Sequence, residues 1–295
     1  MSRWKTCLVS IMVVFFCVGS VAITQDGRGE NPPQETTVVD AGSTAVEETV
    51  ETEVLPPVVD EITLKQNEMR DTTVLVQTRQ GSGSGTIIEC LETDTDGMFR
   101  YIVLTNAHVT HSRFVTILHA VDSLTGKVRA ERVDTGCGVI AFDHEKRDWF
   151  QYTTTVVAED MQYDLALLSF FTEQKLAVAR LADNEMLDQV RVFDEVFAIG
   201  CQLGRAPSPT TGIVSQIITG NNGEKEWVIY GNTAQITPGS SGGGLFKKYE
   251  GHYYMIGIPF RVVIAGNGQI IPHLSHAISI GVAMDFIDQN SVTCP

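Results

Sequence analysis

The segment Thr237–Gly244 (TPGSSGGG) constrains this chain more than any other, because it places one hydroxyl, that of Ser241, inside a run of glycines. Strand-like apolar segments stand on both sides of it, at Trp227–Tyr230 and Tyr253–Ile258. Glycines reach backbone angles that other residues avoid, and they let a substrate approach the chain closely. Such a turn can aim the backbone N–H groups of Gly239 and Ser241 at one point, where an oxyanion would form. A surface turn without chemistry is the alternative that this segment alone leaves open.

Length and charge exclude some classes of function. The chain has 295 residues, 43% of them hydrophobic, which is enough to bury a core in one large domain or two small ones. Its formal net charge of −15 argues against a nucleic-acid partner, because binding phosphates requires a basic face. The acidity gives no reason to expect an anionic membrane surface as a partner either. It mainly implies solubility.

The first 22 residues have the pattern of an export signal. A short positive start precedes Cys7–Ala22, an uncharged and mostly apolar run. The small residues Ser20–Ala22 suit a signal peptidase, so cleavage would fall before Ile23. An uncleaved membrane anchor is the alternative, although the run is shorter than the ~20 residues of a spanning helix. We therefore expect an exported protein: secreted, periplasmic, or anchored with its domain outside the cytoplasm.

Residues 23–62 differ in composition from the rest of the chain. They carry ten acidic residues against one arginine, two Pro-Pro pairs, and no helical or strand period. Such a composition predicts an acidic, disordered linker between the export signal and a domain at residues 63–295. A pro-segment is the alternative.

From Leu64 onward the pattern favours strands over helices. A single short helix is expected near the C-terminus, over Met284–Asp288. The run Gly81–Gly85 is interpreted as a tight turn between strands, and residues 122–151 as an irregular insertion or extended hairpin loop. Many short strands with glycine and proline between them indicate an all-β barrel or sandwich. The expected strands are residues 73–78, 86–90, 101–104, 114–118, 154–158, 165–170, 190–199, 211–215 and 277–283.

Three residues in the order His108, Asp164, Ser241 could share one reaction, nucleophilic acyl transfer. His108 follows the strand 101–104, and Asp164 precedes the apolar run that begins at Leu165. An unpaired carboxylate there is costly, and an imidazole N–H would satisfy it. The imidazole would take the serine proton and return it to the leaving group, while the aspartate holds the imidazole tautomer.

Two neighbours compete for these roles. Asp160 lies near Asp164, but only Asp164 directly precedes the apolar strand. Ser240 adjoins Ser241, but only Ser241 is followed by Gly-Gly.

These segments also resemble a known family. Thr105–Val109 (TNAHV), Asp164–Leu168 (DLALL) and Pro238–Gly243 (PGSSGG) resemble the three signature segments of trypsin-like serine proteases, most closely those of the HtrA/Deg-type branch. The resemblance extends from about Thr72 to Asp288 and implies two packed six-stranded antiparallel β-barrels with the site in the cleft between them. Other segments resemble the same branch in the same order: Gly81–Gly85, Ala198–Gly200 with Leu203–Gly204, and Thr211–Ser215.

The chain departs from that branch in three ways. Gly244 stands where relatives often carry proline, and the stretch between His108 and Asp164 is longer than expected. No PDZ-like segment follows the expected barrels before Pro295, so substrate capture by a PDZ domain is not carried over.

The resemblance also gives an expectation for the substrate pocket. It would be lined by the segment before Ser241, by the strand Ile256–Phe260 and by a strand at Ile280–Ala283. No acidic residue stands six positions before Ser241, which disfavours cleavage after Lys or Arg. No histidine lies in the 258–260 strand, where glutamyl endopeptidases would have one. A preference for small or apolar residues before the scissile bond is expected, with a pocket formed by Gln235, Ile236, Ile258 and Val282.

The remaining cysteines and histidines indicate no cofactor. Four cysteines outside the export segment allow three pairings, among which the sequence does not choose, and we assume no bridge. Two His-x-x-His pairs lack the glutamate and the helix context of a zinc site, so no metal is expected. These residues are Cys90, Cys137, Cys201 and Cys294, and the pairs His108/His111 and His273/His276.

The sequence thus predicts an exported serine endopeptidase that acts on protein or peptide substrates, and it leaves the oligomeric state open. A catalytically silent barrel used for binding is the first alternative. A membrane-tethered structural protein with incidental glycine turns is the second.

Overall fold

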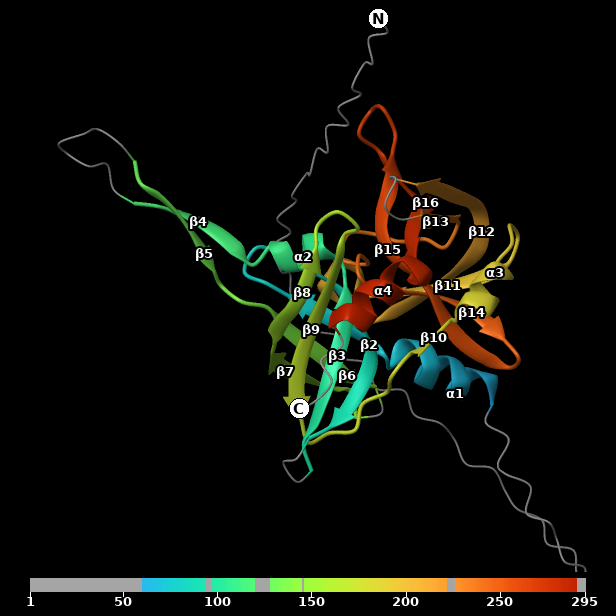
Figure 1. Cartoon of the computed structure of the whole chain (residues 1–295), viewed down its shortest axis with the longest axis horizontal. Helices are drawn as coiled ribbons and strands as arrows, with labels where there is room; N and C mark the ends of the chain where they lie inside the picture. The colour runs from blue at the N-terminus through green and yellow to red at the C-terminus, as the bar shows by residue number, and fades with distance from the viewer. Residues whose placement is uncertain (1–59, 94–96, 120–127, 145, 222–225, 291–295) are drawn as a thin grey trace, which may run out of the picture. The chain divides into compact units, whose positions relative to one another are not determined.

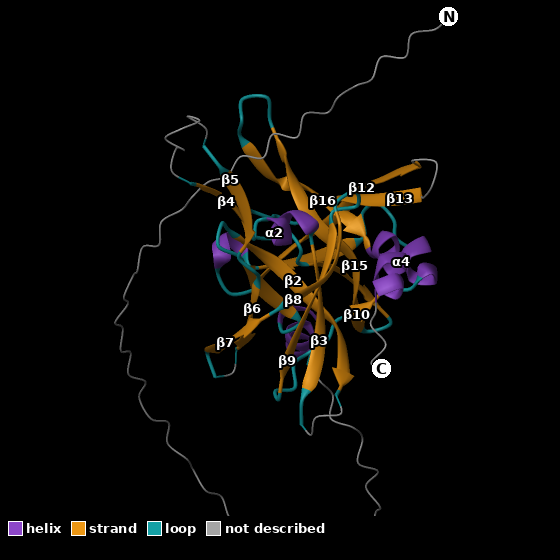
Figure 2. Ribbon diagram, turned by 60° about the vertical axis from the view of Figure 1, so that its left-hand side comes forward, coloured by secondary structure: helices purple, strands orange, loops and turns teal. Residues whose placement is uncertain are grey.

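The computed structural model describes residues 60–93, 97–119, 128–144, 146–221 and 226–290. Two seven-stranded sheets and a separate two-stranded hairpin hold the strands of these residues, with short helices between them (Figures 1 and 2). The expected all-β class with a short C-terminal helix is confirmed. The expected export segment and all but the last three residues of the expected linker lie outside the described residues.

The N-terminal sheet is built from the first half of the described chain. Its strand order is β7-β6-β1-β2-β3-β9-β8. Strand β9 is buried along most of its length, because its apolar residues face the core on both sides of the sheet. The strands are β1 (Thr73–Gln77), β2 (Ser82–Glu92), β3 (Phe99–Thr105), β6 (Gly138–Asp143), β7 (Asp148–Thr153), β8 (Thr155–Asp160) and β9 (Leu165–Thr172).

The C-terminal sheet closes on itself. Its order is β10-β15-β14-β11-β12-β13-β16, and β16 also pairs with β15, so six strands form a closed ring with β10 outside it. The six-strand barrel expected from the family resemblance therefore appears here, whereas the N-terminal sheet has seven strands. The strands are β10 (Arg180–Leu181), β11 (Glu195–Gly200), β12 (Ser208–Asn221), β13 (Glu226–Asn232), β14 (Gly244–Tyr249), β15 (His252–Ile264) and β16 (Ile270–Ser279).

Short helices connect and cover the sheets. Helix α1 (Glu61–Lys65) is capped by the side chain of Asp60, which accepts the N–H of Ile62 at 2.9 Å. It continues into a π-helical turn, Gln66–Arg70. The other helices are α2 (Ala107–His111), α3 (Asn184–Asp188), a 3₁₀ turn at Gln202–Gly204, and α4 (Ile280–Asn290).

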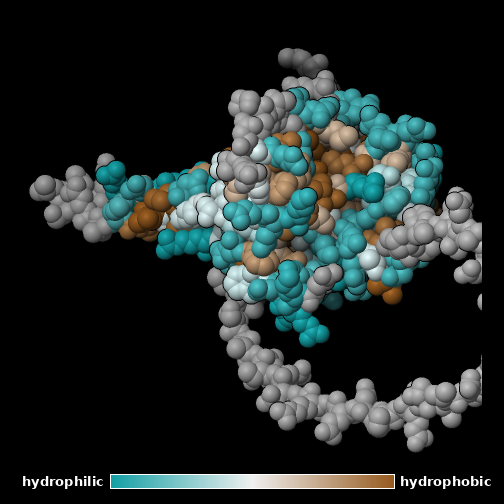
Figure 3. Space-filling view, turned by 90° about the horizontal axis from the view of Figure 1, so that it is seen from below, coloured by the Kyte–Doolittle hydropathy of each residue, from teal (hydrophilic) through white to brown (hydrophobic). Residues whose placement is uncertain are grey.

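A hairpin of β4 (Phe114–Leu118) and β5 (Ala130–Asp134) projects away from the sheets (Figure 1). It carries exposed apolar side chains, Ile117, Leu118 and Val128, and Figure 3 shows hydrophobic surface on this arm. The sequence predicts an irregular insertion or an extended hairpin loop at residues 122–151. In the described part of this stretch β5 completes an extended hairpin, as the second alternative has it, whereas β6 and most of β7 are strands of the N-terminal sheet, which the prediction does not contain.

Three other local expectations are wrong. Residues Ser82–Gly85 lie inside β2 rather than in a turn. A Cβ at Gly85 would stand 2.4 Å from Val103 Cγ1, so the absence of a side chain at Gly85 lets β2 and β3 pack closely. Leu64–Arg70 is helical rather than strand-like. Residues 280–283 form the first turn of α4, not the end of a strand, because β16 ends at Ser279.

Truncation of a core side chain of β9 should be costly. Leu167→Ala is expected to lower the free energy of unfolding by about 2–5 kcal/mol, because Leu167 is fully buried and its loss leaves a cavity. Phe171 on the same strand is 53% exposed, so Phe171→Ala should cost less than about 1 kcal/mol. Urea titrations of both variants measure the difference, and equal losses would contradict this description of the core.

Candidate active site

The pairing of β3 with β9 brings His108 and Asp164 together. Thr105 at the end of β3 pairs with Ala166 near the start of β9. Antiparallel strands place the end of one beside the beginning of the other, so α2 after β3 meets the residue that precedes β9. His108 Nδ1 lies 2.8 Å from Asp164 Oδ2 and 3.0 Å from Oδ1. The carboxylate also accepts the backbone N–H of His108 at 2.9 Å, so it fixes both the ring and its backbone.

Asp164 adopts an unusual backbone conformation that a neighbour supports. Its φ of 56° lies in the left-handed region, which aspartate tolerates better than most residues. Asn106 occupies the N-cap position of α2, but its side chain makes no capping bond. Instead, Asn106 Nδ2 donates to the carbonyl of Asp164 at 2.9 Å. Asn106, which precedes α2, therefore holds the backbone of Asp164, which precedes β9. Sequence reasoning missed this link between the two segments.

The turn around Ser241 packs against the segment that leads to His108. A Cβ at Gly242 would lie 2.2 Å from Thr105 Oγ1 and 3.1 Å from Asn106 N, and Gly242 has a φ of 86°. Only glycine fits both the conformation and the space. The same holds at Gly239, where φ is 98° and a Cβ would lie 2.6 Å from the carbonyl oxygen of Cys201. Gly242 thus brings the Ser241 turn directly against the β3–α2 segment, and Gly239 brings it against the segment that follows β11.

Hydrogen bonds orient the two peptides that contain the N–H groups of Gly239 and Ser241. Leu203 N–H donates to Pro238 O at 2.8 Å, and Gly243 N–H donates to Ser240 O at 3.1 Å. In a trans peptide the N–H points opposite to the C=O, so the N–H groups of Gly239 and Ser241 point away from those donors. Among the described residues, nothing accepts a hydrogen bond from either N–H. Neither N–H is therefore engaged by the described part of the chain.

The hydroxyl of Ser241 has a partner of its own. Ser241 Oγ donates to the carbonyl of Phe260 on β15 at 3.3 Å. Within the described part of the chain, no hydrogen bond joins it to the His108 ring. The side chain of His108 is 46% exposed, so its outer face is open to solvent and to a bound molecule.

The two competing residues have structural roles. Asp160 Oδ1 accepts the N–H groups of Gln162 and Tyr163 at 2.8 and 3.0 Å, which closes the turn between β8 and β9. Ser240 is 2% exposed, and its Oγ accepts the N–H of Thr237 at 3.3 Å. Asp160 therefore does not occupy a position equivalent to that of Asp164, and Ser240 does not occupy one equivalent to that of Ser241.

The expected pocket residues do not form a common surface. Ile236, Ile258 and Val282 are each at most 4% exposed and belong to the core of the C-terminal sheet, whereas Gln235 is exposed. The expected strand wall at residues 280–283 is helical. The preference for small or apolar residues before the scissile bond therefore stays a prediction. The three buried side chains contribute no exposed surface to a pocket.

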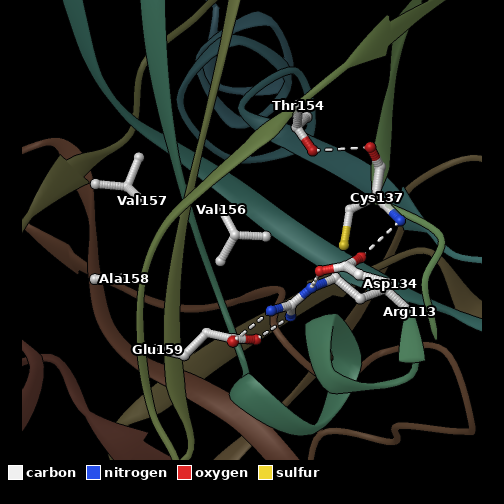
Figure 4. A pocket seen from close by; sticks show the side chains of 9 residues that line it. Arg113, Asp134, Cys137, Thr154, Val156, Val157, Ala158 and Glu159 are labelled. Atoms are coloured by element: carbon white, nitrogen blue, oxygen red, sulfur yellow. Dashed lines mark hydrogen bonds and ion pairs between the residues drawn. The ribbon is translucent and has the colours of Figure 1, made fainter. Parts of the chain in front are cut away.

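A partly buried ion-pair network anchors the helix that carries His108 (Figure 4). Arg113, just after α2, donates to both carboxylate oxygens of Glu159 on β8 and, through Nε, to Asp134 at 2.8 Å. Glu159 also accepts the hydroxyl of Thr110 at 2.5 Å. Burial opposes ionisation of Glu159, but the hydrogen bonds from Arg113 and Thr110 prevail and lower its pKa below the ordinary 4.5. The arginine thus ties α2 to β8 and to the end of the β4–β5 hairpin.

This network should stabilise the fold in a pH-dependent way. Because the pKa of Glu159 is lowered by folding, its contribution is present above about pH 4.5 and is lost as the pH falls through the folded-state pKa. Glu159→Gln is expected to lower the free energy of unfolding by about 1–3 kcal/mol at pH 7. The difference in the free energy of unfolding between Glu159→Gln and wild type should become smaller at acidic pH.

Urea titrations at pH 7 and pH 3 measure this gap. Glu173→Gln, at an exposed site, serves as the control and should stay within about 0.5 kcal/mol of wild type. A gap for Glu159→Gln that is constant with pH would contradict the ion-pair interpretation.

Cysteines and possible ligand sites add little to this picture. Cys90, Cys137 and Cys201 carry free thiols, and Cys294 lies outside the described residues. Burial raises the pKa of the Cys137 thiol to about 11. No three histidine, cysteine, aspartate or glutamate side chains of the described ranges are gathered so as to hold a metal ion. Among the helices described, none has the length and apolar character needed to cross a membrane.

Comparison with known proteins gives three results. A model of the trypsin-like peptidase domain family matches residues 83–258. The periplasmic pH-dependent serine endoprotease DegQ of Escherichia coli is 32% identical over 124 residues, which is 42% of this chain and 26% of DegQ. The putative protease Do-like 14 of Arabidopsis thaliana is 31% identical over 190 residues, 63% of this chain and 37% of that protein.

The fold has solved counterparts as well. The crystal structure of Deg5 superimposes with a TM-score of 0.52 at 23% identity, over 76% of this chain and 90% of Deg5. The chain thus matches about a quarter to two fifths of the length of these curated relatives, and most of the length of Deg5.

Proposed function

Because the chain belongs to the family of trypsin-like peptidase domains, we propose that it is a serine endopeptidase in which Ser241 attacks the scissile carbonyl. The resemblance to the HtrA/Deg-type branch is confirmed by the DegQ and Do-like relatives. The observation that carries the proposal is the 2.8 Å contact between His108 Nδ1 and Asp164 Oδ2, beside a glycine turn whose two N–H groups are free.

The proposed reaction begins with proton transfer. His108 Nε2 takes the proton of Ser241 Oγ, and Oγ forms a bond to the carbonyl carbon of the substrate. The electron pair of the C=O bond moves to the oxygen, and the N–H groups of Gly239 and Ser241 hold the resulting oxyanion. The intermediate then collapses, and the leaving amine takes the proton from His108. Water repeats the same steps on the acyl-enzyme and releases the acid.

Asp164 orients the base in this reaction. Its carboxylate accepts from Nδ1, so the proton of a neutral His108 stays on Nδ1 and Nε2 remains free to accept. The same carboxylate stabilises the cation that forms when Nε2 is protonated.

The serine must move for the reaction to start. Its hydroxyl donates to Phe260 O, so a rotation about the Cα–Cβ bond of Ser241 has to bring Oγ to the His108 ring. Catalytic hydrogen bonds in proteins without substrate are often long and tighten when substrate binds. This same contact favours the alternative, a catalytically silent barrel that binds peptides without cutting them.

The setting proposed for the reaction rests on the relatives and on the first 22 residues. DegQ is named as a periplasmic enzyme, and residues 1–22 resemble an export signal, so we propose that the domain works outside the cytoplasm on protein or peptide substrates. A preference for small or apolar residues before the scissile bond belongs to the same proposal.

A fluorophosphonate probe tests the proposal directly. The probe reacts with a serine only where a base and an oxyanion site activate it. The purified full chain is expected to become labelled, with the label on the peptide that contains Ser241, and heat-unfolded protein serves as the control. A folded chain that stays unlabelled across pH 5–9, and that cleaves no casein, would favour the silent barrel.

A further inference from the structure

Ser84 makes an unusual set of contacts at the nucleophile turn. It is fully buried, and it lies in the glycine-serine run of β2. Its hydroxyl donates to the carbonyl of Gly239 at 2.6 Å and accepts the N–H of Cys201 at 2.7 Å. Its own N–H donates to the carbonyl of Ser241 at 2.7 Å. One residue of the N-terminal sheet therefore bonds two residues of the turn.

These contacts complete a regular pattern. The carbonyls of four consecutive residues, 238 to 241, each accept one hydrogen bond: from Leu203 N–H, Ser84 Oγ, Gly243 N–H and Ser84 N–H, in that order. The bond from Ser84 Oγ is the one that comes from a side chain. The other three bonds come from backbone N–H groups. The bond to the Gly239 carbonyl is therefore the one that depends on which side chain stands at position 84.

The Gly239 carbonyl needs such support more than the others. It belongs to the peptide that connects the two N–H-bearing peptides, so its orientation sets the angle between the N–H groups of Gly239 and Ser241. The N–H of the same peptide, that of Ser240, donates to Thr237 O at 3.0 Å, so the peptide is held at both ends. Glycine at a φ of 98° has other accessible conformations, and a peptide held at one end alone would reach them more often. A turn that samples these conformations would hold its two donors at one point for only part of the time.

We propose that Ser84 is a positioning residue, whose hydroxyl fixes the Gly239 carbonyl and thereby aligns the two N–H donors for the oxyanion. The inference rests on the proposed function. The hydroxyl bridges segments 155 and 117 residues away in the chain, so the N-terminal sheet contributes to an oxyanion site that belongs to the C-terminal sheet. The Cys201 N–H, held by the same oxygen, keeps the hydroxyl proton directed at Gly239.

The test compares Ser84→Ala with a matched buried serine. Ser279 is 3% exposed, and its hydroxyl likewise accepts a backbone N–H, from Gly281, and contacts a second group, Tyr230 Oη, each at 3.3 Å. The rate of fluorophosphonate labelling is measured against probe concentration, together with the melting temperature of each full-length variant. This separates the maximal rate constant from the half-saturating concentration.

Ser84→Ala is expected to lower the maximal labelling rate constant by about 10-fold to 100-fold, less than the loss of a whole oxyanion donor. Its half-saturating concentration should stay within about threefold of wild type. Ser279→Ala should lower the melting temperature without changing the labelling rate per folded molecule. Ser84→Cys, which keeps a weak donor, should label at a rate between those of Ser84→Ala and wild type.

The following results would contradict the positioning role of Ser84. A folded Ser84→Ala that labels at the wild-type rate overturns it, and so does a change in the half-saturating concentration alone. If Ser84→Ala does not fold, Ser84→Cys decides in the same way, and failure of both to fold assigns Ser84 to general stability and overturns the positioning role. A wild type that never labels overturns the proposed function and this inference together, so the two failures are distinguishable.

Discussion

Ser241→Ala is expected to abolish fluorophosphonate labelling and to lower the turnover of a peptide substrate by about 10⁶-fold, because it removes the attacking oxygen. The folded structure should survive. The Ser241 hydroxyl makes a single 3.3 Å hydrogen bond to Phe260 O, and the turn is held by bonds to backbone groups that alanine keeps. Residual hydrolysis above the uncatalysed rate is expected from the Gly239 and Ser241 N–H groups alone.

The measurement pairs labelling with turnover of a fluorescent casein and with the melting temperature. Ser240→Ala is the neighbouring control: its hydroxyl is buried and accepts the N–H of Thr237, so labelling should persist. Labelling that survives in Ser241→Ala and disappears in Ser240→Ala would transfer the nucleophile assignment to Ser240. Labelling of both variants would mean that another residue reacts with the probe.

Much of the candidate site was predictable because it depends on short segments. His108 and Asp164 each stand at the end of an apolar strand, and antiparallel pairing of two such strands brings their ends together. The glycines around Ser241 could be interpreted from the sequence because positive φ and close approach both require glycine. The strand-rich class and the C-terminal helix followed from the same local patterns.

The parts that depend on distant partners were not predictable in this way. The run Gly81–Gly85 has the composition of a turn, yet its residues from Ser82 onward belong to β2. Gly85 packs against Val103, and Ser84 finds its partners 117 and 155 residues further along. Tertiary contacts override local preference there. Arg113 and Glu159 are ordinary charged residues in the sequence, and their pairing near His108 appears only when α2 and β8 are placed side by side.

The residues that line a substrate pocket could not be identified from the sequence for a related reason. Isoleucine and valine residues near a nucleophile are as suitable for a core as for a pocket, and the pattern does not say which way they point. Ile236, Ile258 and Val282 all turn inward. The end of the last strand was also misplaced, because the apolar run 277–283 spans the junction of β16 and α4 and suits both elements.

Asp164→Asn is expected to lower turnover by about 10⁴-fold while leaving the fold intact. Asparagine tolerates a φ of 56° as aspartate does, so the backbone needs no rearrangement. The Asn106 bond to the carbonyl of residue 164 is also unaffected. The melting temperature should therefore stay close to that of wild type, and the effect on turnover should come from the side chain alone.

The geometry of the carboxylate explains why the amide should be so damaging. Oδ1 accepts the backbone N–H of His108 at 2.9 Å, so the oxygen of an asparagine must occupy that position. Its NH₂ group then takes the place of Oδ2, 2.8 Å from His108 Nδ1, and donates to it. This forces the ring proton onto Nε2, which can no longer accept the proton of Ser241.

The matched control is Asp160→Asn, four residues away in the same turn. Asp160 accepts two backbone N–H groups and contacts neither His108 nor Ser241, so this variant should keep its turnover within about threefold even if its stability falls by about 1 kcal/mol. Steady-state kinetics with casein and labelling rates with the probe are compared for both variants. If Asp160→Asn were the inactive variant and Asp164→Asn the active one, the orienting carboxylate would be Asp160. If Asp164→Asn kept full activity, His108 would not act as a base held by Asp164, and the proposed triad would have to be abandoned.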